Sequence, residues 1–185
     1  MDAQSPFDLG VSNASVSFRV RWFGVVTVSG RFDAITGTLL VGNDEDDLAV
    51  TVDVSSASVK TGIALRDRHL RGRRFLGAER HPVIRFASDR VRRRDDGWEV
   101  GGRLSLRGST RDVHLLVRDE PSSGTVRRLT GEFTVPRQPH EIGVAFGIRR
   151  LNPLLWAIGD EVLLRVELLV PVTLLQRVAE HAPVR

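Results

Sequence analysis

The chain has no cysteine and no tyrosine, and it has a single methionine. Without cysteine it can form no disulfide, no thiolate metal site and no cysteine nucleophile. Lysine is nearly absent as well, because Lys60 is the only lysine among 27 basic residues. Schiff-base chemistry would therefore depend on Lys60, and no neighbouring residue in the sequence would activate it.

Sequence motifs that bind nucleotides or mark hydrolases are also missing. There is no P-loop, no G-x-G-x-x-G, no G-x-S-x-G and no H-E-x-x-H. The five histidines show no pair at the tight spacing of metal ligands, so we expect neither a metal nor another cofactor. No segment approaches the roughly 18 uninterrupted apolar residues of a membrane helix. The first residues lack the pattern of a secretory signal, so we expect a cytoplasmic protein without a transmembrane segment.

Apolar and polar residues alternate with a period of two in several stretches. Val16, Phe18 and Val20 form the first apolar row, with polar residues between them. Equivalent rows lie within residues 49–55, 84–87, 103–107, 113–118 and 162–168. This alternation indicates half-buried antiparallel strands. Turn sequences such as RRRDDG and RGST separate some of the rows, so the pattern predicts an all-β sandwich or an up-and-down barrel.

Two segments break the alternation. Residues 61–80 have helical spacing but contain Gly72 and Gly77, which predicts one short helix or a structured loop. Residues 137–159 combine prolines and glycines with many large apolar side chains. A long apolar loop of this kind indicates a lid or part of the wall of a ligand cavity.

Five arginines gather in the first of these segments: Arg66, Arg68, Arg71, Arg73 and Arg74. Guanidinium groups suit phosphates, whether in nucleic acid or in a lipid head group. The alternative is that these arginines are solvated or paired with nearby carboxylates. The polar faces of the predicted strands carry Ser, Thr, Asp and Arg rather than the aromatic residues on which single-stranded nucleic acid stacks. We therefore expect no nucleic-acid partner.

Three blocks of the sequence stand out in order: SVSFRVRWFGVVTVSGRFDAITGTLLVG, VDVSSASVKTGIALRDRHLRGRRFLGAERHPVIRFAS and GGRLSLRGSTRDVHLLV. The middle block is the most specific, with its Arg66-Asp67-x-His69-Leu70 run. The segment from Leu104 to Val113 adds an L-x-L-x-G-x-T-x-x-V pattern. In these features the chain resembles the YceI-like family of polyisoprenoid-binding or lipid-binding domains. The resemblance covers roughly residues 11–172, so we expect residues 1–185 to form one domain.

The resemblance implies an eight-stranded antiparallel lipocalin-like β-barrel with one or two short helices. A barrel of eight strands can just hold a ligand inside, and the family is thought to bind polyisoprenoids or other long lipophilic chains there. Strand phase, the apolar loops and the resemblance together predict the residues that line the cavity: Phe18, Trp22, Val52, Leu70, Phe75, Phe86, Leu104, Leu115, Phe146 and Val166.

Arg66, Asp67 and His69 are the predicted rim of this cavity. Arg66 and His69 lie one helical turn apart, so in a helix they share a face and could hold a ligand head group. The rival interpretation is that Arg66 and Asp67 only tie the loop to the barrel wall.

The leading functional hypothesis is a non-enzymatic carrier or sequestering protein for a polyisoprenoid lipid. A general scavenger of lipophilic small molecules, including quinones or drugs, would need the same barrel. A lipid-modifying enzyme would use His69 and Asp67 as acid and base, and is the third alternative. The sequence leaves open whether the domain forms a homodimer.

Overall fold

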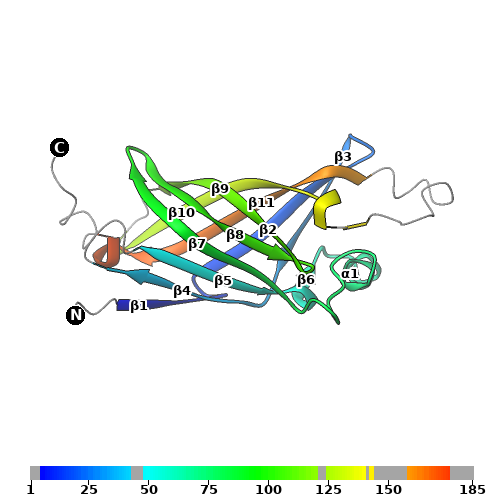
Figure 1. The fold of residues 1–185 in the computed structure, drawn as a ribbon, viewed down its shortest axis with the longest axis horizontal. Helices are drawn as coiled ribbons and strands as arrows, with labels where there is room; N and C mark the ends of the chain where they lie inside the picture. The colour runs from blue at the N-terminus through cyan, green and yellow to red at the C-terminus, as the bar shows by residue number, and fades with distance from the viewer. Residues whose placement is uncertain (1–4, 43–47, 121–123, 141, 144–157, 176–185) are drawn as a thin grey trace.

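A computed structural model describes residues 5–42, 48–120, 124–140, 142–143 and 158–175. Eleven strands form one antiparallel sheet in the order β1-β4-β5-β7-β8-β9-β10-β11-β2-β3-β6 (Figure 1). Their bounds are β1 Ser5–Gly10, β2 Ala14–Trp22, β3 Val26–Phe32, β4 Ile35–Val41, β5 Ala49–Ser55, β6 Val59–Lys60, β7 Val83–Arg94, β8 Gly97–Leu106, β9 Ser109–Glu120, β10 Val126–Pro136 and β11 Ile158–Pro171. The short helix α1 spans Ala64–Arg71, and single 3-10 turns lie at Ser56–Ser58 and Gln138–His140.

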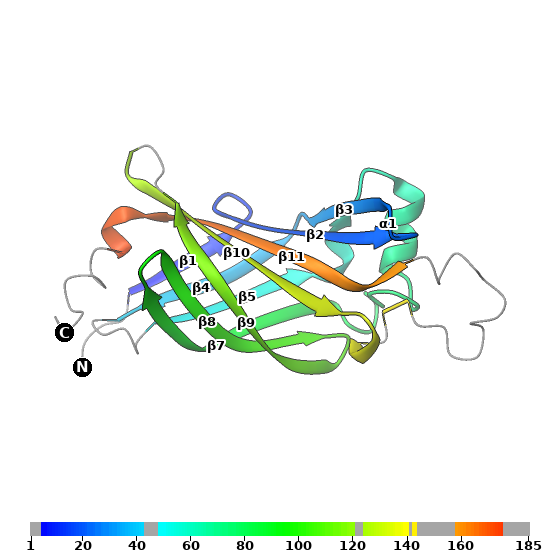
Figure 2. The same cartoon turned by 90° about the horizontal axis from the view of Figure 1, so that it is seen from above.

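The sheet curls strongly into an elongated half-barrel (Figure 2). The all-β antiparallel class was predicted correctly, but the number of eight strands was wrong. Asp33 and Ala34 interrupt what would otherwise be one long strand and divide it into β3 and β4. The short strands β1 and β6 then add to the two ends of the sheet, where they pair with β4 and β3.

The period-two alternation divides the sheet into an apolar inner face and a polar outer face. In β8, Trp98, Val100 and Leu104 are buried, whereas Arg103 is exposed. Ion pairs between neighbouring strands cover part of the outer face: Arg85 with Asp53, and Arg165 with Glu132. Opposite charges placed directly across strands favour one register over its neighbours.

The segment between β6 and β7 contains α1 and a series of hydrogen-bonded turns, so it is both a short helix and a structured loop. The helix ends at Gly72, and the amides of Leu76 and Ala78 donate to the carbonyls of Leu70 and Arg71. These bonds satisfy carbonyls that a helix end leaves without partners. The segment is also tied to the sheet, because the Ser56 hydroxyl donates to the His81 carbonyl at 2.7 Å. None of the described helices is long and apolar enough to cross a membrane.

Candidate functional site: an apolar cavity with a cationic opening

The inner face of the half-barrel encloses a cavity of about 920 Å³. Side chains from both halves of the sheet line it, including Val16 of β2, Val52 of β5, Leu104 of β8 and Val166 of β11. This volume lies at the upper end of the range for small-molecule sites, which is about 300–1,000 Å³. The inner-facing side chains of the strands therefore line a cavity and do not pack against one another as a continuous core.

Polar lining is confined to one end of the cavity. All the charged or titratable side chains that line it are basic: Arg66, Arg68, His69, Arg73, Arg74 and Arg137. Five of them belong to α1 and the turns that follow it, and the sixth follows β10. No carboxylate lines the cavity in the part of the chain that the structure describes. The cavity thus has an apolar body and a positively charged end.

The charged end is open, and buried apolar side chains lie at the opposite end. Arg68, Arg73 and Arg74 line the cavity and are also exposed to solvent, so the cavity opens beside α1. At the far end Val41 and Trp98 are buried, with exposed fractions of 4% and 5%. The guanidinium of Arg93 lies 4.8 Å from the centre of the Trp98 ring. A bound molecule would therefore enter beside α1 and extend toward Trp98.

Nine of the ten predicted cavity residues line this space: Phe18, Trp22, Val52, Leu70, Phe75, Phe86, Leu104, Leu115 and Val166. Phe146 lies outside the described residues. The strand residues among the nine occupy the apolar phase of their strands, which is why the sequence could identify them. Their contact with a ligand stays a prediction.

Thr61 brings Arg66 and Asp67 together. The Asp67 Oδ1 atom accepts hydrogen bonds from the Thr61 amide at 2.8 Å and from the Thr61 hydroxyl at 2.5 Å. The Arg66 side chain donates to the same hydroxyl oxygen at 2.7 Å and to the Thr61 carbonyl at 2.8 Å. Asp67 is buried and does not line the cavity, whereas Arg66 does. This geometry matches the structural alternative, in which the two residues fix the segment that carries α1.

The hydrogen bond from Thr61 holds the pKa of Asp67 below its ordinary value of 3.8, despite the opposing effect of burial. A carboxyl whose pKa is lower in the folded state stabilises the protein above the unfolded pKa. That contribution is lost as the pH falls through the folded pKa.

We therefore expect Asp67→Asn to lower the unfolding midpoint at pH 7 and to reduce the loss of stability between pH 4 and pH 2. Urea unfolding across this range measures the effect, with Asp112→Asn on the exposed face of β9 as the control. An unchanged acid transition in Asp67→Asn would contradict the role given to Thr61.

His69 and Asp67 do not form a catalytic pair. They lie two positions apart on α1, and side chains at this spacing do not face one another on a helix. Asp67 accepts its bonds from Thr61, while His69 is exposed at the cavity opening. Among the described residues, no three His, Asp or Glu side chains are arranged to hold a metal ion.

Arg137 is the feature of the site that the sequence did not reveal. Its side chain is buried, and it donates to the carbonyls of Gly159 at 2.5 Å and Ile142 at 2.8 Å. Asp160 lies 3.4 Å away. Burial lowers the pKa of Arg137, and the nearby Asp160 opposes that shift. Arg137 therefore joins the end of β10 to the beginning of β11 while it also lines the cavity.

Comparisons with known proteins agree with this architecture. The crystal structure of BcnA from Burkholderia cenocepacia matches with a TM-score of 0.72 at 16% identity, covering 85% of this chain and 96% of that one. A YceI protein from Campylobacter jejuni matches with a TM-score of 0.66 at 18% identity, covering 80% and 86%. A structure from Saccharophagus degradans, described as a polyisoprenoid binding domain, matches with a TM-score of 0.62 at 17% identity, covering 90% and 98%.

Sequence relatives are closer in identity but cover less of the chain. A UPF0312 protein of Pectobacterium atrosepticum is 32% identical over 61% of this chain, and a UPF0312 protein of Yersinia pestis is 35% identical over 56%. The matched segments span 59% and 54% of the lengths of those two relatives. The model of the YceI-like domain matches residues 7–170, which is most of the sequence. The chain therefore belongs to the family of proteins with a YceI-like domain.

Proposed function

We propose that the protein binds a polyisoprenoid or a similar long lipophilic chain in the cavity and carries or sequesters it without chemical change. The observation that carries this proposal is the combination of an apolar cavity of about 920 Å³ with a single cationic end. The description of the Saccharophagus degradans domain as polyisoprenoid binding adds support.

Burial of the chain supplies the affinity. Each methylene group removed from water contributes about 0.8 kcal/mol, so a five-carbon unit contributes about 4 kcal/mol before the costs of ordering the ligand are subtracted. Among the described residues, the wall between the opening and Trp98 offers only apolar side chains to the ligand. The wall therefore favours ligands whose length and width fit the cavity. Quinones and other lipophilic molecules with a suitable tail are the second class of ligand that this wall favours.

Affinity should rise with chain length until the cavity is full. We expect the dissociation constant of prenyl alcohols to fall by about 100-fold for each added five-carbon unit, once the cost of ordering the unit is subtracted, and then to level off. Titration followed by tryptophan fluorescence measures this, because Trp22 and Trp98 line the cavity at different places. In a Trp22→Phe/Trp156→Phe variant only Trp98 emits, and it should respond to long chains but not to short ones. Equal affinities for all lengths would refute binding inside the cavity.

The arginines at the opening should add a preference for anionic head groups. The side chains of Arg68, Arg73 and Arg74 make no hydrogen bond or ion pair with other described residues, whereas that of Arg66 is engaged with Thr61. Charge-assisted bonds to phosphate would therefore come from these three residues.

We expect a prenyl phosphate to bind about tenfold more tightly than the matching alcohol. The triple variant Arg68→Gln/Arg73→Gln/Arg74→Gln should abolish this preference and leave alcohol binding unchanged. The control variant Arg90→Gln/Arg92→Gln/Arg118→Gln removes the same charge from the halves of β7 and β9 that lie away from the opening. Equal loss of preference in both variants would show that net charge alone is responsible.

A further inference from the structure

Large apolar side chains are exposed at the open end of the cavity. Five of the eight such side chains in the described part of the molecule belong to two segments. Phe23, Val25 and Val26 lie at the turn between β2 and β3, with exposed fractions of 58%, 83% and 49%. Ile63 and Leu65 lie at the start of α1, with 53% and 61%. We call these five residues the apolar tip.

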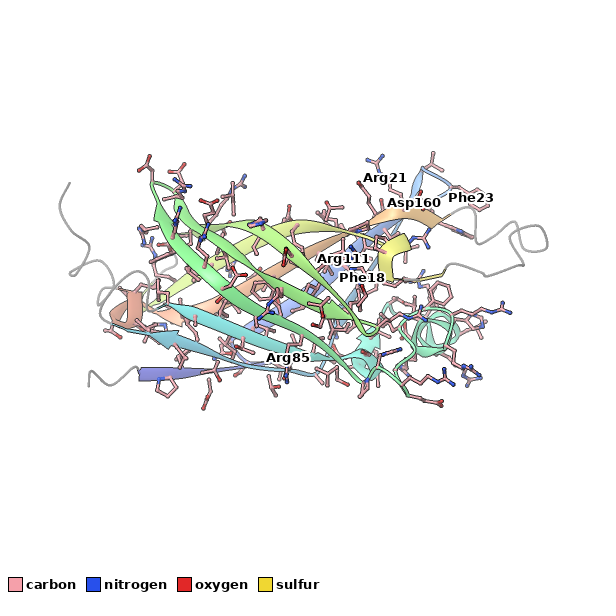
Figure 3. The ribbon with its side chains drawn as sticks, in the orientation of Figure 1. Phe18, Arg21, Phe23, Arg85, Arg111 and Asp160 are labelled. Atoms are coloured by element: carbon pink, nitrogen blue, oxygen red, sulfur yellow. The ribbon has the colours of Figure 1, made fainter. Side chains whose placement is uncertain are left out.

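The two segments of the apolar tip lie at the same end of the molecule. Figures 1 and 2 both show the turn between β2 and β3 at the end that carries α1. The pairing of β3 with β6 explains this, because β6 leads directly into the segment that contains α1. Figure 3 shows Phe23 at this end, pointing away from the sheet.

The backbone of Phe23 presents its ring to solvent. Its φ angle of 53° is in the left-handed region, which costs a residue with a side chain about 1–2 kcal/mol. Gly24 follows with a φ of 70°. The ring of Phe23 contacts Trp22, and Phe23 stays 58% exposed although its backbone conformation is costly.

Basic side chains surround the apolar tip. Arg68, Arg73 and Arg74 are exposed on α1 and the turns after it, and Figure 3 shows the exposed Arg21 at the same end. The exposed carboxylates of Glu79, Asp160 and Glu161 offset part of this charge, and that of Asp160 lies 3.4 Å from the buried guanidinium of Arg137. Exposed apolar groups flanked by arginine are the features with which peripheral proteins bind anionic lipid surfaces. Each basic residue near such a surface contributes about 1 kcal/mol.

The apolar tip is continuous with the cavity. Trp22 lines the cavity, and its ring centre lies 5.0 Å from that of Phe23. A lipid chain that left a membrane beside Phe23 would therefore meet Trp22 next and would not cross water. A second copy of the chain fits this surface poorly, because pairing two such ends would bring like charges together.

We propose that the open end of the cavity docks on the surface of an anionic lipid bilayer through the apolar tip, with Arg21, Arg68, Arg73 and Arg74 on the lipid head groups. Docking places the cavity opening against the membrane, where the lipid of the proposed function would be exchanged. The apolar tip and the cavity adjoin but share no residue, so each can be tested by its own substitutions.

Vesicle flotation tests the docking. We expect the protein to float with vesicles of equal parts phosphatidylcholine and phosphatidylglycerol, and to bind vesicles of phosphatidylcholine alone at least tenfold more weakly. Val25→Asp should reduce binding to the anionic vesicles by at least tenfold. Val11→Asp is the matched control, since Val11 is a valine with 65% exposure in the turn between β1 and β2.

Phe23→Asn is a second variant. It should fold normally, because asparagine tolerates a left-handed backbone better than other residues with a side chain. It should lose vesicle binding like Val25→Asp. Equal flotation of Val25→Asp, Phe23→Asn and the unchanged protein would overturn the proposal. A second result would also overturn the proposal. If the unchanged protein bound no vesicles and the two variants sedimented differently from it, the apolar tip would be a contact with a second copy of the chain.

Titration with farnesyl phosphate in solution separates the two proposals. Both tip variants should bind it as the unchanged protein does, because they leave the cavity intact. Flotation without farnesyl phosphate binding would retain the docking surface and remove the lipid-binding function. Farnesyl phosphate binding without flotation would retain the lipid-binding function and remove the docking surface.

Discussion

Gly131→Leu is expected to weaken the binding of a long prenyl chain by roughly 100-fold, because it fills the half of the cavity near Trp98. Gly131 of β10 lines the cavity and pairs with Val117, which in turn pairs with Trp98. The new side chain would displace about four methylene groups of the ligand, at about 0.8 kcal/mol each. A two-unit prenyl alcohol that ends before this level should keep its affinity within about threefold.

The substitution is compatible with folding. A β-carbon at position 131 would lie 2.7 Å from the Cδ1 atom of Leu115, which is the mobile end of a flexible side chain, and 3.2 Å from Val117. Gly10→Leu adds the same side chain at a place outside the cavity and serves as the control. Calorimetric titration with short and long alcohols measures the difference. Equal loss for both lengths would mean that the chain does not extend toward Trp98.

Arg137→Met is expected to lower the free energy of unfolding by about 3 kcal/mol. The substitution keeps much of the length of the side chain but removes the donors to the carbonyls of Gly159 and Ile142. A buried carbonyl without a partner costs about 1–3 kcal/mol, and Asp160 would lose its buried cationic partner.

Urea unfolding measures this loss, and Arg165→Met provides the comparison. Arg165 pairs with Glu132 at 3.3 Å and Glu167 at 3.9 Å, but its side chain is 40% exposed. Exposed ion pairs contribute about 0–1 kcal/mol. If the two methionine variants lost equal stability, the bonds of Arg137 at the ends of β10 and β11 would not have the structural role assigned to them.

The sequence predicted the long strands because their apolar residues follow a simple period. The rows of β2, β5 and β11 can be read directly, since one face of each strand turns to the cavity and the other to solvent. The number of strands could not be predicted in the same way, because it depends on features that have no sequence period. The interruption at Asp33 and Ala34 and the two-residue strand β6 are set by how the sheet curls, and local sequence does not record that.

The candidate site was predictable in outline for a different reason. The arginine-rich segment resembles a family motif, and that resemblance led to the prediction that it lies at the cavity opening. The structure was needed to distinguish the residues of this segment that are held in place from those that face solvent. Thr61 engages Arg66 and Asp67, whereas Arg68 and Arg73 face solvent. Arg137 carried no signal of its own, since its partners are backbone carbonyls that could belong to any residue type.

The hollow interior has a consequence for how long the protein survives in a cell. A ligand that occupies the cavity completes the hydrophobic core, and it binds the folded chain but not the unfolded one. By mass action, free ligand at about 100 times its dissociation constant adds about 2.7 kcal/mol to the free energy of unfolding. Unfolded chains are removed by proteases, and changes of about 1–2 kcal/mol already alter abundance several-fold. The cellular level of this protein should therefore follow the supply of its ligand without any change in its synthesis.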